Sequence, residues 1–137
     1  MPTLMAILTG LLLSARVLGQ ADEEMMRLRG TWYLLSTADE RRTDPGSLQS
    51  RMEVGAGGHI TFKSDHTVTN QGKITLGSAG QLRTIDLKLT DGRTLLGVYE
   101  VTGDELTVCF AEAGKSRPGE LRPKGTQWAE RWKRERL

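Results

Sequence analysis

The feature that most constrains this chain is a run of alternating apolar and polar residues, interrupted by tight turns, at residues 84–110. Along 85–89 three branched apolar residues alternate with two charged ones, which is typical of a strand with one buried face. The Asp-Gly pair at 91–92 is favoured in type I′ hairpin turns, and the Gly-Asp pair at 103–104 suits a type II′ turn. This segment therefore predicts consecutive antiparallel strands.

Similar punctuation extends over the rest of the chain. Residues 30–36 are rich in aromatic and branched side chains, residues 59–70 have the pattern of a hairpin, and 73–76 is a short strand candidate. Residues 37–51 are polar and contain Asp-Pro-Gly, which predicts a long loop. Many short strands separated by frequent turns indicate an all-β sandwich or barrel.

The C-terminal segment fits two structures. Trp128 and Trp132 are four residues apart, as in one stripe of a helix, but they also share one face of a strand, with Glu130 between them. The pattern alone leaves both structures open.

The N-terminus is typical of a secretory signal peptide. The apolar stretch from Leu4 to Leu13 is about half as long as a membrane span requires. Val17 and Gly19 are small residues at a suitable spacing for cleavage before Gln20. A buried N-terminal helix is the competing interpretation.

The predicted organisation is a signal peptide at 1–19, a linker at 20–26 and one domain at 27–137, in a chain of 137 residues. We expect an exported protein, periplasmic or extracellular, with no transmembrane span. The single cysteine, Cys109, excludes an internal disulfide.

Several motifs together carry a family resemblance. They are Gly-Thr-Trp at 30–32, Ile-Asp-Leu at 85–87, Leu-Gly-Val-Tyr-Glu at 96–100, the Gly-Asp turn, Cys-Phe-Ala at 109–111, Gly-Lys-Ser-Arg-Pro at 114–118 and Lys-Arg-Glu at 133–135. Over residues 27–135 the chain resembles the small exported lipocalin-like domains of uncharacterised function that are abundant in planctomycete bacteria. The resemblance implies an antiparallel up-and-down β-barrel of about eight strands, and it implies no reaction.

The same resemblance implies how the barrel is closed. In lipocalin-like barrels the tryptophan of a Gly-x-Trp motif on the first strand seals one end, and a basic side chain near the end of the last strand covers it. Here the tryptophan is Trp32 and the basic residue is Arg134, or Lys133 if the register of the strand slips. A guanidinium over an indole gains about 0.5–2 kcal/mol.

Three functions follow from such a barrel. The favoured one is binding of a small apolar or amphipathic molecule, and the alternative is a protein-interaction or structural module of the cell envelope with a filled barrel. The residues expected to line a ligand cavity are Trp32, Leu34, Phe62, Leu87, Leu106, Val108 and Phe110, and a packed core would use the same set. A hydrolase or isomerase ranks last, because it would need Asp86, Glu100 or His66 to converge in a cleft.

The sequence gives weaker signals for a phosphate loop, a reactive cysteine or a metal site. The Gly-Lys-Ser at 114–116 is not a phosphate loop, because Cys109 stands where the first glycine is required, so we interpret Lys115 and Arg117 as solvated. Cys109 is expected to pack as a small apolar side chain. His59 and His66 lack a third convergent ligand, so neither a metal site nor a cofactor is predicted.

The charge pattern names no partner by itself. The net charge is +2 at pH 7, and from Lys115 onward Lys and Arg outnumber Glu by eight to three. We interpret this excess as a solvated strand edge, and the export leader argues against nucleic acid.

Overall fold

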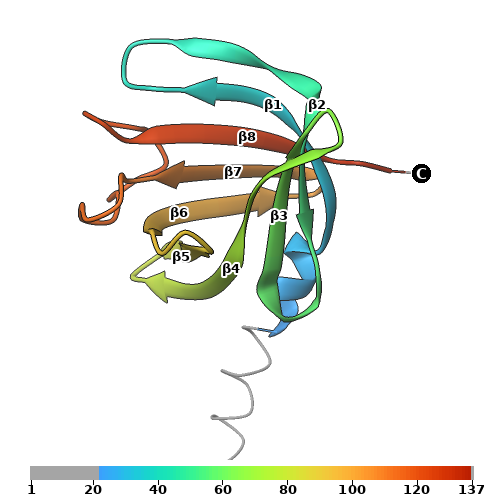
Figure 1. Cartoon of the computed structure of the whole chain (residues 1–137). Coiled ribbons are helices and arrows are strands. Elements are labelled where there is room, and N and C mark those ends of the chain that lie inside the picture. The colour runs from blue at the N-terminus through green and yellow to red at the C-terminus, as the bar shows by residue number, and fades with distance from the viewer. Residues whose placement is uncertain (1–21, 137) are drawn as a thin grey trace, which may run out of the picture.

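The computed structural model describes residues 22–136, which form one closed antiparallel barrel (Figure 1). Its strands are β1 (Gly30–Ala38), β2 (Thr43–Val54), β3 (His59–Ser64), β4 (Thr67–Ala79), β5 (Leu82–Leu89), β6 (Thr94–Thr102), β7 (Glu105–Phe110) and β8 (Trp128–Arg134). A 3-10 turn, η1 (Ala56–Gly58), joins β2 to β3, and residues 22–28 form a helix before β1. The predicted signal peptide at 1–19 lies outside the described residues.

The connectivity is up-and-down throughout. Each strand pairs antiparallel with the next, and β8 pairs antiparallel with β1 to close the barrel. This arrangement confirms the predicted all-β, eight-stranded up-and-down fold. It also shows that the C-terminal segment is a strand, because β8 has a hydrogen-bonding partner along each of its two edges.

The loop predicted at 37–51 is wrong. Most of this segment belongs to a β1–β2 hairpin, in which Ser36 pairs with Pro45 and Ala38 with Thr43. The side chain of Asp39 ends β1 by accepting hydrogen bonds from two backbone amides of the turn. Pairing of β2 with β3 begins only at Ser50, so the first half of β2 has one neighbour and tolerates a proline, which would disrupt a central strand.

Of the two turn types predicted from the sequence, one is confirmed and the other is wrong. Gly103 has φ +60° in a two-residue loop between Thr102 and Glu105, as a type II′ turn requires. The β5–β6 loop is not the predicted type I′ turn, because only Gly92, with φ +99°, has a positive φ there. Its Leu89–Arg93 hydrogen bond fits a longer hairpin loop with one left-handed residue.

One end of the barrel is filled and covered. In Figure 1 the helix at 22–28, in blue, lies at the end where β1 begins. The buried side chains that fill this part of the interior include Leu28, Trp32, Met52, Val54, Ile60, Ile74, Ile85, Tyr99 and Leu106. Residues 22–26, the described part of the predicted linker, are helical, and Met25 packs against the barrel core.

A polar contact holds this helix to the strands. Glu24 accepts a 3.0 Å hydrogen bond from the hydroxyl of Tyr99 and pairs with Arg83 and, at 3.4 Å, with Arg27. Burial, the neighbouring carboxylate and the hydrogen bond to it together raise the pKa of Tyr99 above its ordinary value, so this hydroxyl stays protonated and donates.

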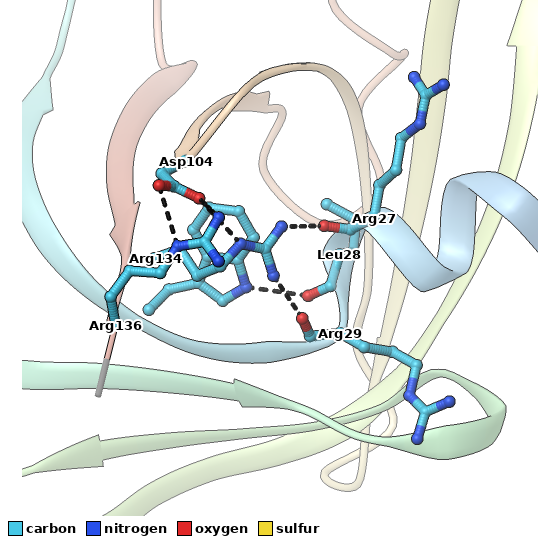
Figure 2. Close-up of polar contacts among 7 residues, drawn as sticks. Arg27, Leu28, Arg29, Asp104, Arg134 and Arg136 are labelled. Carbon is cyan, nitrogen blue, oxygen red and sulfur yellow. Dashed lines mark hydrogen bonds and ion pairs between the residues drawn. The ribbon is translucent and has the colours of Figure 1, made fainter.

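Arg134 and Trp32 form a clasp at the covered end. Figure 2 shows the polar contacts of Arg134 with the backbone at Arg27 and Arg29 and with Asp104. The Trp32 side chain is fully buried, and its Nε1 donates a 2.8 Å hydrogen bond to the carbonyl of Leu28. The guanidinium carbon of Arg134 lies 4.2 Å from the indole centroid. The same guanidinium donates to the carbonyls of Arg27 and Arg29, so β1, β8 and the helix meet at one side chain.

We expect Arg134→Met to lower the free energy of unfolding by about 2 kcal/mol, because methionine keeps the apolar packing but removes the cation over the indole and two donors. Urea unfolding followed by tryptophan fluorescence measures this change. The matched control is Arg131→Met, whose exposed ion pair with Glu105 is worth at most about 1 kcal/mol. Equal losses in the two variants would contradict the role of the clasp.

Candidate functional site

The other half of the barrel is hollow. A cavity of about 330 Å³ opens at the end opposite the helix, where β1, β3, β5 and β7 finish. Its lining is Leu34, Ser50, Arg51, Phe62, Lys63, Ser64, Thr69, Asn70, Leu87, Leu89, Arg93, Leu95, Phe110, Trp128, Glu130 and Trp132. This volume lies at the lower end of the range for small-molecule sites.

The predicted lining residues divide between the two halves. Leu34, Phe62, Leu87 and Phe110 line the cavity. Leu106 and Val108 border a separate space of only about 20 Å³ inside the barrel, which Phe62, Leu87 and Phe110 border as well. Trp32 lies in the closed end, fully buried. The barrel is thus packed in one half and open in the other. The sequence could not show which of the predicted residues belong to the packed half and which line the open half.

The most unusual side chain in the cavity is Glu130. It lies on β8 between Trp128 and Trp132, and all three point inward because alternate strand residues share a face. Trp132 Nε1 donates to Oε1 and Trp128 Nε1 donates to Oε2, each at 3.1 Å. The two indoles therefore hold the carboxyl group from both sides.

Further aromatic contacts hold the two indoles. The ring centroid of Phe62 lies 6.2 Å from that of Trp132, and the centroid of Phe110 lies 5.8 Å from that of Trp128. Both pairs are tilted, a geometry that aromatic side chains favour. The carboxyl group is thus positioned by residues that are themselves packed.

Burial raises the pKa of Glu130, while the two indole hydrogen bonds act in the opposite direction and are the weaker effect. The side chain keeps part of its surface open, but that surface faces the cavity. Sequence reasoning did not select Glu130 as a site residue. The available signal was its position midway between two tryptophans, which makes it inward-facing only if the segment is a strand.

Cys109 faces the outside of the barrel but is covered. It belongs to an apolar cluster with Val98 and Ala129, against which Leu121 of the β7–β8 connection packs. Its side chain is fully buried, and burial raises its pKa to about 11. The expectation of a packed, unreactive thiol agrees with this environment.

The solvated interpretation of Arg117 is wrong. Its Nη1 donates to the carbonyl of Gly97 at 2.9 Å, and its Nη2 lies 2.7 Å from Asp86 Oδ1 in an ion pair. Because Asp86 lies on β5 and Gly97 on β6, one side chain fastens the β7–β8 connection to the outer face of two strands. Lys115 is exposed, as predicted.

The other candidate catalytic and metal-binding residues do not come together in one site. Asp86 lies on the outer face beside Arg117, Glu100 is exposed on β6, and His66 is exposed in the β3–β4 turn. His59 and His66 occupy opposite ends of β3. Among residues 22–136 there is no group of three acidic, histidine or cysteine side chains that could hold a metal ion.

The basic C-terminal segment is mostly ion-paired. The residues in ion pairs are Arg117, Lys124, Arg131, Arg134 and Arg136, five of the eight basic residues from position 115 onward. The interpretation of this segment as a strand edge is wrong for β8, because β7 and β1 flank it on both sides.

Comparisons of the chain with protein-family models, with curated proteins and with solved structures give no match. Within the described part of the chain, no helix is both long and apolar enough to cross a membrane.

The raised pKa of Glu130 predicts a pH dependence. Between about 4.5, its ordinary value, and the raised value, the folded protein binds more protons than the unfolded chain, so this residue lowers stability as pH rises. We expect the free energy of unfolding of Glu130→Gln, minus that of the unchanged protein, to grow with pH across this window. Urea unfolding at a series of pH values measures the difference, and a constant difference would contradict the prediction.

Cys109 gives a second prediction. A pKa of about 11 in place of 9.0 makes its thiolate about a hundredfold scarcer near neutral pH, and burial blocks access as well. We expect Ellman's reagent to label the native protein far more slowly than the urea-unfolded protein. Arg117→Met, which releases the covering connection, should speed native labelling, whereas Lys115→Met should not. Rapid labelling of the unchanged protein would contradict this account.

Proposed function

We propose that this barrel binds a small molecule with an apolar body in its open half. The observation that carries the proposal is the cavity of about 330 Å³, in which apolar and aromatic side chains form half of the lining and two indoles hold one carboxyl group inside it. Ligand sites are typically concave, mostly apolar and equipped with a few placed polar groups. The filled, clasped end gives the cavity a floor and a fixed shape.

The alternative of a filled structural barrel has less support, because the half beyond the clasp is hollow. A hydrolase or isomerase also has less support, because Asp86, Glu100 and His66 lie apart on the outside. The proposal places the chain among the exported lipocalin-like domains that its motifs resemble, in the periplasm or outside the cell. Support for that setting comes from the signal-like pattern at 1–19.

The test uses N-phenyl-1-naphthylamine, a neutral apolar probe whose fluorescence rises in apolar surroundings. We expect saturable binding to the unchanged protein. Leu34→Trp, which adds bulk on the cavity wall, should weaken binding at least about tenfold, since apolar contacts inside the site are replaced by overlap. The dissociation constant from fluorescence titration is the measurement.

The matched control is Leu48→Trp, which adds the same side chain at an exposed position on β2, where Leu48 is 67% exposed. Near-ultraviolet circular dichroism checks that both variants keep the native packing. Absence of probe binding to the unchanged protein would overturn the proposal, and so would equal binding by the two variants.

A further inference from the structure

The carboxyl group of Glu130 has no positively charged partner in the described part of the chain. None of the ion pairs among residues 22–136 includes Glu130. Three basic residues contribute to the cavity wall, but each is paired with another acid: Arg51 with Glu135, Lys63 with Glu53 and Arg93 with Asp91. The barrel therefore carries an acidic group inside and keeps the nearby cations occupied elsewhere.

The two tryptophans do not exhaust the acceptor capacity of this group. A carboxylate has about four lone-pair sites, and each oxygen here accepts one indole hydrogen bond. Roughly two acceptor sites remain, and Glu130 lines the cavity. An isolated carboxylate in an apolar site is costly, so the group either takes a proton or gains a cation.

The surrounding rings favour the same kind of guest. Phe62, Phe110, Trp128 and Trp132 all line the cavity with Glu130. Aromatic faces attract an ammonium group, and the attraction grows when the cation is removed from water. Leucine side chains from β1, β5 and β6 supply apolar contacts beyond the rings.

The geometry points to a small protonated amine with an apolar body as the ligand class, its ammonium group paired with Glu130. This inference rests on the proposed ligand-binding function and adds the recognition chemistry. A carboxylate ligand would be repelled by Glu130. A neutral alcohol would fill a lone-pair site but would leave the charge of Glu130 uncompensated.

Proton linkage follows from the same pairing. The charged groups on the cavity wall besides Glu130 are Arg51, Lys63 and Arg93, while Leu34 on β1 and Phe110 on β7, the strands that flank β8, do not titrate. An alkylammonium keeps its charge up to about pH 10. Binding requires the carboxylate form of Glu130, so amine affinity should rise as pH rises from about 4.5 through the raised pKa of this residue.

The experiment compares 2-phenylethylamine with 2-phenylethanol, which has the same shape without the charge, by isothermal titration calorimetry. We expect the amine to bind the unchanged protein at least about tenfold more tightly than the alcohol, because a charge-assisted pair replaces a neutral hydrogen bond. Glu130→Gln should abolish this preference while it keeps binding of the alcohol. Glu105→Gln, an exposed residue on β7, is the control and should keep the preference.

The outcomes separate this inference from the function on which it rests. The inference fails if the alcohol binds as well as the amine, if Glu130→Gln keeps the amine preference, or if amine affinity falls with rising pH. In each of these cases saturable binding of N-phenyl-1-naphthylamine would still support a ligand cavity. If that probe does not bind the unchanged protein, the proposed function fails as well.

Discussion

The stacking of Arg134 over Trp32 is the contact on which the rest of the barrel depends. It joins the first strand, the last strand and the helix before β1, and it pairs the two residues across the closing seam. Side chains alternate along a strand, so a slip of one residue in β8 would exchange its inner and outer faces. The clasp therefore fixes the register of β8 as well as adding stability. With Arg134 over the indole, Trp132, Glu130 and Trp128 must point inward.

Glu130 is then best understood as a group retained despite its energetic cost. A carboxyl group inside a small barrel loses solvation, and an apolar residue in the same place would contribute to packing. Among residues 22–136 only the two indoles donate hydrogen bonds to this carboxyl group, although basic residues stand on the same wall. Glu130 does serve the fold by accepting the two indole N–H bonds, but it forms no ion pair among residues 22–136, and a titratable group with a perturbed pKa in a cleft tends to mark a site of function.

The sequence predicted strands from residue alternation, as at 84–110, which left a sandwich or a barrel open, and the closed barrel was what the motif resemblance implied. It failed at 37–51 because a proline and a glycine are strong loop signals, and whether β2 has one neighbour or two depends on the finished sheet. Arg117 was missed because its partners on β5 and β6 are brought to it only by folding. The cavity itself could not be predicted, since the same apolar residues fill one half of the barrel and line the other.

A single glycine, Gly97, contacts both a residue that lines the cavity and a residue on the outer face of the barrel. Gly97 on β6 pairs with Phe110 on β7, and a Cβ at position 97 would lie only 2.8 Å from the Phe110 ring. The missing side chain leaves room for the Phe110 ring to lie against Gly97, where the ring also contacts Trp128. On the other side of the same strand, the carbonyl of Gly97 accepts the hydrogen bond from Arg117. The hydrogen bond from the β7–β8 connection and the ring that lines the cavity thus meet at one residue, although Arg117 and Asp86 lie outside the lining.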